Sequence, residues 1–182
     1  MEFSETKLEG SYLISLTRIS DARGYFARGW CKDEFAKHGL NPNMVQLNTA
    51  HSHKQGTLRG LHFQRAPHAE AKFVRCTRGA LFDVMVDLRP DSPTHRNWYG
   101  AELTPENGRM LYVPEGFAHG YQTLVDDTEM YYMTTATYAA ASAGGVRFDD
   151  PAFAIDWPLP IAVVSEADRG WPDYAASNEP NR

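Results

Sequence analysis

The sequence predicts an all-β sandwich or barrel. Short runs of β-branched and aromatic residues recur along the chain with turn residues between them, whereas few stretches have helical spacing. The chain has 182 residues, of which 42% are hydrophobic and 23% charged, as in an ordinary globular domain with a core. We therefore expect a single domain over residues 1–182, with a polar C-terminal tail that frays from about residue 175.

The clearest strand covers residues 80–88 (ALFDVMVDL), because its even-numbered residues from Phe82 to Leu88 are apolar and would share one face. Gly79 precedes it and turn-forming residues follow it. Further strands are expected at residues 72–76, 98–103, 110–113, 121–124 and 129–135. In a barrel of such strands every second side chain points into the lumen, where a small ligand can bind.

Helical signals are sparse. One helix is expected over residues 32–38, with Gly39 at its C-terminal cap. A shorter helical turn is expected at residues 105–107. So few helices among many strands agree with a sandwich or barrel.

The charge and cysteine content narrow the possible partners. A net charge of −5 and a pI near 5.8 give no general attraction to nucleic acid or to an anionic membrane, so a phosphate-bearing ligand needs a local basic pocket. The two cysteines, Cys31 and Cys76, form no disulfide framework or zinc knuckle. The first ten residues lack the apolar core of a signal peptide, and no apolar run approaches the roughly 18 residues of a membrane helix. We expect a cytoplasmic protein.

Functional residues are densest at residues 56–64 (GTLRGLHFQ). In a regular strand the even-numbered residues, His62 among them, would face one way, and Arg59 and the other odd-numbered residues would face the other. Gly60 would leave space beside His62 for a ligand. A lone histidine in such a strand is more often structural than catalytic, so other residues must support a catalytic interpretation.

Three further features support catalysis. His119 lies in a glycine-flanked turn at residues 114–120, and Lys72 begins an apolar strand, an unfavourable place for a charge without a partner or a function. Of the adjacent Tyr131 and Tyr132, only one can face the lumen. A base such as His62, a cation and a phenol around one cavity suit proton abstraction next to a carbonyl.

Several segments together resemble the dTDP-4-dehydrorhamnose 3,5-epimerase family. They are residues 59–64 (RGLHFQ), 72–76 (KFVRC), 82–89 (FDVMVDLR), 114–120 (PEGFAHG) and 149–158 (DDPAFAIDWP). The resemblance runs in order from about Asp21 to Asp168. It implies a cupin jelly-roll barrel, usually a homodimer, that acts without a cofactor on a nucleotide-linked 4-keto-6-deoxy sugar. Epimerisation could occur at C3, at C5 or at both.

The resemblance also implies the site residues. His62 would remove the proton at C3 or C5, Asp168 would orient His62, Lys72 would stabilise the enolate oxygen at C4, and Tyr132 would be the acid on the other face. The implied ligand contacts are Arg59, Arg23 and His119 for the diphosphate and sugar, Gln46, Asn48 and Phe26 for the nucleoside, and Tyr138 for stacking on the base.

Three positions depart from the family pattern around the nucleotide: Arg28 stands where a glutamate is common, and Ala143 and Ala167 replace polar residues. Arginine donates hydrogen bonds where a carboxylate accepts them. Either Arg28 alters recognition of the nucleobase or sugar, or the loop is shifted and Arg28 faces solvent.

Two other function classes compete with epimerisation: a cupin that binds a nucleotide sugar without turnover, and a metal-dependent cupin enzyme. A binding module need not keep His62, Lys72, Tyr132 and Asp168 together. The usual metal signature of cupins, two histidines one residue apart and then a glutamate, is broken here because Gln64 follows His62. His51 and His53 do have that spacing, but they stand in a polar, loop-like stretch at residues 49–56, and we interpret them as solvated surface. We expect no metal.

Overall fold

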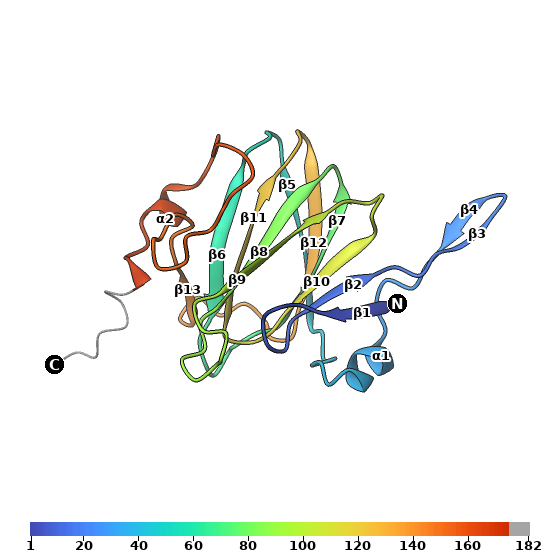
Figure 1. Cartoon of the computed structure of the whole chain (residues 1–182), viewed down its shortest axis with the longest axis horizontal. Helices are drawn as coiled ribbons and strands as arrows, with labels where there is room; N and C mark the ends of the chain where they lie inside the picture. Colours follow the sequence, from blue (N-terminus) through green and yellow to red (C-terminus); the bar gives the residue numbers. More distant parts are fainter. Residues whose placement is uncertain (175–182) are drawn as a thin grey trace.

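The computed structural model describes residues 1–174, which form two antiparallel sheets and a separate hairpin (Figure 1). The first sheet has the order β1 (Glu2–Glu5), β2 (Tyr12–Ser15), β10 (Arg109–Val113), β7 (Lys72–Arg78), β12 (Thr128–Thr134) and β5 (Gln46–Ser52). The second has the order β13 (Ala143–Gly145), β6 (Leu58–Gln64), β11 (Phe117–Thr123), β8 (Leu81–Asp87) and β9 (Trp98–Leu103). This arrangement confirms the predicted all-β jelly-roll barrel. The tail expected to fray lies outside the described residues.

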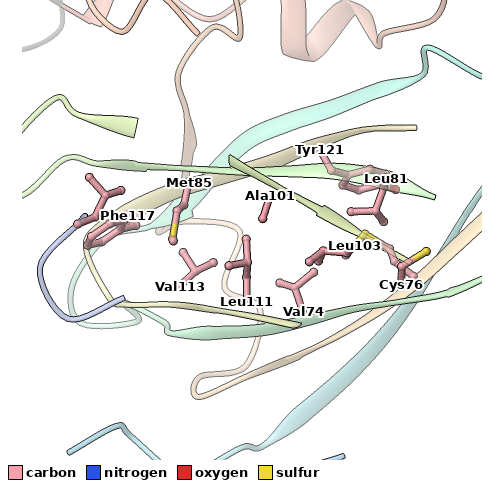
Figure 2. Close-up of a cluster of buried hydrophobic side chains, with 12 residues drawn as sticks. Val74, Cys76, Leu81, Met85, Ala101, Leu103, Leu111, Val113, Phe117 and Tyr121 are labelled. Atoms are coloured by element: carbon pink, nitrogen blue, oxygen red, sulfur yellow. The ribbon is translucent and has the colours of Figure 1, made fainter. Parts of the chain in front are cut away.

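The hydrophobic core lies between the two sheets. Val74 and Leu111 from the first sheet meet Met85 and Leu103 from the second, and all four side chains are fully buried (Figure 2). Full burial of such a side chain contributes roughly 1.5–3 kcal/mol. The same core includes Met130 of β12 and Tyr121 of β11, so it holds in place β7, β11 and β12, three of the strands that carry the candidate site.

Most predicted strands are confirmed, with one shifted start. β9 matches its predicted range, and β7, β8, β10 and β12 agree within two residues. β11 begins at Phe117, four residues before the predicted start at Tyr121, so His119 lies within a strand and not in a turn. The turn is confined to the residues just before Phe117, and all of β11 is buried because it is the central strand of its sheet.

The helices are short. α1 (Lys32–Lys37) confirms the predicted helix, with Gly39 in the left-handed region after it, and α2 (Glu166–Arg169) follows an N-cap by Ser165. The turn expected at residues 105–107 is present but does not extend into a helix. The Gly108 N–H donates to the Thr104 carbonyl at 3.1 Å, as in one helical turn, and the side chains of Thr104 and Asn107 accept further backbone N–H groups. Among residues 1–174 no helix is long and apolar enough to cross a membrane.

The stretch at residues 49–56 is not the loop that its polarity suggested. β5 continues to Ser52 and pairs with β12, with His51 opposite Glu129. The polar residues belong to a strand at the end of its sheet, so its outward side chains meet solvent and need not be apolar. The loop begins only at His53.

β6 breaks the regular alternation expected for it. His119 pairs with His62 and Tyr121 pairs with Arg59, so three steps along β6 match two along β11. This bulge adds one residue to β6 and interrupts the alternation of its side chains between the two faces. Arg59 therefore faces the same cavity as His62, contrary to the prediction. The prediction that Gly60 leaves space for a ligand is also wrong, because a Cβ on Gly60 would lie 2.6 Å from the Cα of Gly120. Gly60 permits close approach of β11.

A hairpin of β3 (Ile19–Asp21) and β4 (Gly24–Phe26) projects away from the barrel (Figure 1). Its strands pair only with each other in the described structure. Ile19, Tyr25 and Phe26 are exposed on it, with Ile19 and Phe26 each 68% exposed. Large apolar side chains on a projecting arm are typical of a surface that another chain covers.

Candidate active site

One cavity of about 590 Å³ opens between the two sheets and is lined by half of the predicted site residues. β5 supplies Gln46 and Asn48, β6 supplies His62, β7 supplies Lys72 and β12 supplies Tyr132. An adjoining space of about 200 Å³ shares the last three and adds Arg59 and His119. The structure thus brings the predicted base, cation and phenol together around one cavity.

His62 is held by Asp168. Its Nε2 lies 2.6 Å from Asp168 Oδ1, while Oδ2 of the same carboxylate accepts the Gly60 N–H at 3.3 Å. The His62 side chain is 48% exposed, whereas Asp168 is 7% exposed. Burial by itself would raise the pKa of Asp168, but its hydrogen bonds with His62, Gly60 and Ser165 bring the pKa below its usual value. A carboxylate only accepts, so Nε2 carries a proton and Nδ1 is the basic nitrogen of His62.

Lys72 is buried and stands beside a carboxylate that the sequence analysis overlooked. Its Nζ donates to the His62 carbonyl at 3.2 Å and lies 3.4 Å from Glu70 Oε1. Glu70 also accepts a hydrogen bond from Gln64 Nε2. Burial lowers the pKa of Lys72, and the charges of Glu70 and Asp83 oppose that fall. The signal available in the sequence was the position of Glu70 two residues before the lysine.

Tyr132 is the tyrosine that faces the lumen, and Tyr131 is not among the residues lining either cavity. Burial and then the charge of Glu70 raise the pKa of Tyr132, against the smaller effect of Arg59. Its phenol is therefore protonated at neutral pH and can donate a proton. Because Tyr132 belongs to the first sheet and His62 to the second, the two side chains enter the cavity from opposite walls.

The inner end of the site is basic, although the chain as a whole is acidic. His119 Nε2 lies 2.8 Å from the buried Asp83 Oδ1. Arg59 donates to the His51 carbonyl at 3.0 Å and to Ser52 Oγ at 3.3 Å, which ties its guanidinium to β5. Together with Lys72 these groups form the local basic pocket that an anionic ligand requires.

The outer end of the cavity is amidic and aromatic. Gln46 donates to Asn48 Oδ1 at 2.9 Å and accepts the Tyr138 N–H at 3.2 Å. The Tyr138 side chain is 68% exposed at the cavity wall, where a flat ligand could stack on it. Trp171 also lines the cavity and was missed, although the two aromatic residues within residues 170–174 (GWPDY) were a usable signal.

Arg23, Phe26 and Arg28 are not brought to the cavity within this chain. Arg23 is paired with Asp21 in the projecting hairpin, and Arg28 Nη1 lies 2.9 Å from Glu34 Oε1. Of the other two departures from the family pattern, Ala143 lines the main cavity, whereas Ala167 lines a neighbouring one beside Asp168.

Among the described residues, the one group of metal-binding side chains within ligand distance lies elsewhere, at His51, His53 and Asp127.

The barrel and the arrangement around His62 define a cupin-type acid–base enzyme. The chain belongs to the dTDP-4-dehydrorhamnose 3,5-epimerase family, whose sequence profile matches residues 5–176. The enzyme of that name from Sinorhizobium fredii is 46% identical over 173 residues, covering 94% of this chain and 89% of the relative.

Solved structures agree with this membership. The crystal structure of dTDP-4-dehydrorhamnose 3,5-epimerase from Elizabethkingia anophelis has a TM-score of 0.94 at 40% identity and covers 98% of this chain and 99% of its own. The Bacillus anthracis enzyme, solved with TDP and PPi bound, has a TM-score of 0.91 at 39% identity, with 94% and 98% coverage. The membership inferred from sequence motifs is confirmed.

Proposed function

We propose that this chain epimerises a dTDP-linked 4-keto-6-deoxy sugar at C3, at C5 or at both, through an enolate. The observation that carries the proposal is the placement of the His62–Asp168 pair and Tyr132 on opposite walls, with the Lys72 ammonium lining the same cavity. Inversion of a carbon requires a base on one face and an acid on the other. A cation near both can stabilise the charge that forms between the two steps.

The reaction begins when His62 Nδ1 removes the proton from a carbon next to the C4 carbonyl. The electron pair of the broken C–H bond forms a carbon–carbon double bond, and the carbonyl electrons move to oxygen. Lys72 stabilises this oxyanion. Tyr132 then donates its proton to the opposite face of the carbon and the carbonyl re-forms, after which solvent restores the protonation states of His62 and Tyr132. C3 and C5 both adjoin C4, so the same groups serve either centre.

The two ends of the cavity suit the rest of a nucleotide sugar. Arg59 and His119 contact the diphosphate and sugar, Gln46 and Asn48 contact the nucleoside, and Tyr138 stacks on the base. The TDP and PPi in the Bacillus anthracis relative support a thymidine nucleotide. For Arg28, both explanations stay open: its pairing with Glu34 fits an exposed position, and altered recognition predicts that Arg28→Glu strengthens dTDP binding.

The active form is a homodimer. Arg23 and Phe26, implied as ligand contacts, line none of the three cavities found among residues 1–174, and neither does Arg28, so a second copy would have to bring them to the ligand. The exposed apolar residues on β3 and β4, together with Leu47 of β5 and Val45 just before it, support such an interface. Sedimentation equilibrium of the wild type and of Phe26→Asp tests it: a dimer that the substitution weakens supports the interface, and a wild-type monomer contradicts it.

Two free cysteines fit a cytoplasmic setting.

The test of function is incubation with dTDP-4-keto-6-deoxyglucose in D2O, followed by proton NMR of the sugar. Loss of the signals at both H3 and H5 with inverted products is expected for a 3,5-epimerase, and loss at one position identifies a single-centre enzyme. Parallel samples with the CDP- and GDP-linked sugars test the nucleotide. Saturable binding of the dTDP sugar without exchange at either carbon would contradict the proposal and identify a binding module.

A further inference from the structure

Two imidazoles and a carboxylate converge on the outer surface of the barrel, away from the catalytic cavity. His51 is the penultimate residue of β5, His53 follows the strand, and Asp127 lies in the loop that joins β11 to β12. His51 Nε2 lies 3.5 Å and His53 Nδ1 lies 3.7 Å from Asp127 Oδ1. All three ligand atoms lie within 4.8 Å of one another. The polar, loop-like interpretation of these histidines did not foresee the third residue.

Strand alternation places this cluster on the side of the sheet opposite the catalytic site. Asn48 and Ala50 line the two inner cavities, so His51, one residue further along β5, points outward. Glu129 stands directly opposite His51 in the register and adds negative charge to the same face. The His51 side chain is 33% exposed and that of His53 is 90% exposed, so an ion can reach both from solvent.

The spacing suits a tetrahedral divalent ion. Zn²⁺ binds histidine nitrogen and carboxylate oxygen at about 2.0–2.2 Å, which puts neighbouring ligand atoms of a tetrahedron roughly 3.3–3.6 Å apart. The distances from Asp127 Oδ1 to the two imidazole nitrogens, 3.5 and 3.7 Å, lie within a few tenths of an ångström of that range. Two imidazoles with one carboxylate are a ligand set that zinc accepts, with water at the fourth position.

We infer that His51, His53 and Asp127 form a Zn²⁺-binding site on the outer face of the barrel, separate from the epimerase chemistry. The ion would link the end of β5 to the loop between β11 and β12. The site does not depend on the proposed reaction, because none of its side chains lines the catalytic cavity.

The test is isothermal titration of ZnCl₂ into the full-length protein in metal-free buffer. Wild type is expected to bind one Zn²⁺ per chain, and His53→Ala and Asp127→Asn are each expected to weaken binding by at least about tenfold. Neither variant threatens folding, because His53 is exposed and asparagine readily adopts the left-handed backbone of Asp127, whose φ is 50°. His38→Ala, which removes another exposed histidine, should bind like wild type.

A second probe reports the geometry. Co²⁺ in a tetrahedral site gives visible absorption that hydrated Co²⁺ lacks, and this absorption should appear in wild type and in His38→Ala but not in His53→Ala. The inference is overturned if wild type shows no saturable Zn²⁺ binding, or if the His53 and Asp127 variants bind as tightly as wild type.

Discussion

His62 Nε2 and Asp168 Oδ1 lie 2.6 Å apart although 106 residues separate them in the chain. The bond joins β6 to α2, and the same carboxylate also accepts the backbone N–H of Gly60. Asp168 thereby fixes both the orientation and the tautomer of the imidazole. The proposed catalytic base is thus positioned by a short helix near the end of the described chain.

Replacing Asp168 by asparagine tests this positioning. Asp168→Asn keeps the shape of the side chain but removes the charge and allows the wrong tautomer of His62, so kcat is expected to fall by roughly 10²- to 10⁴-fold with a smaller change in KM. Steady-state kinetics on the dTDP-linked keto sugar measure the effect. The matched control is Asp156→Asn at an exposed carboxylate, which should keep wild-type kcat. An Asp168→Asn enzyme with undiminished kcat would show that the pair has no catalytic function.

The ion pair of Glu70 with Lys72 predicts a pH effect. Burial lowers the pKa of Lys72 and Glu70 raises it, so Glu70→Gln should lower that pKa further. Under our proposal Lys72 must be protonated to stabilise the enolate. The alkaline fall of kcat in Glu70→Gln should therefore occur at a lower pH than in wild type. Glu106→Gln, at an exposed carboxylate, should leave the profile in place. If kcat of Glu70→Gln falls at the same alkaline pH as kcat of wild type, Glu70 does not govern the charge of Lys72.

The exposed ring of Tyr138 predicts a contribution to nucleotide affinity. Stacking of a base on an aromatic side chain is worth about 1–3 kcal/mol, so Tyr138→Ala should raise the Kd for dTDP roughly 5- to 100-fold. Tyr138→Phe keeps the ring and should bind within about twofold of wild type. Calorimetric titration with dTDP compares the three proteins. Equal affinities of the alanine and phenylalanine variants would exclude stacking.

Asp87 predicts a pH-dependent contribution to stability. Burial by itself would raise its pKa, but bonds from Arg89, Ser92 and Thr94 bring the pKa to about 2. The folded state therefore gains stability above the unfolded pKa near 3.9 and loses it as pH falls toward 2. Asp87→Asn should cost about 1–2 kcal/mol at pH 7 and about half as much at pH 3. Urea unfolding at both pH values measures this, and an equal loss at both would refute the electrostatic origin.

The sequence predicted most of the barrel and the centre of the site because both leave local signals. Strand β9 was found to the residue from its pattern and turns, and Lys72 stood out as a charge in an apolar strand. His62 and Tyr132 could then be grouped because side chains on alternating positions share a lumen. Asp168 left no such signal, since its proximity to His62 depends on how the C-terminal segment folds back, and only family resemblance identified it.

Other features could not be predicted because they depend on non-local pairing. The bulge that turns Arg59 toward His62 exists only in the register between β6 and β11, and Gly60 gives no sign of it in the sequence. The polar end of β5 looked like a loop because its pairing with β12 is not visible locally. The positions of Phe26 and Arg28 relative to a ligand depend, under our proposal, on a second chain.

The central claim is that His62 and Tyr132 act on opposite faces of one carbon. The most direct measurement is deuterium exchange from D2O into the dTDP-linked keto sugar, with the configuration of each labelled carbon read by NMR, for wild type, His62→Ala and Tyr132→Phe. We predict label with inversion in wild type, no label in His62→Ala, and label without inversion in Tyr132→Phe, because His62 can return deuterium only to the face from which it took the proton. Undiminished label in His62→Ala, or undiminished inversion in Tyr132→Phe, would contradict the account.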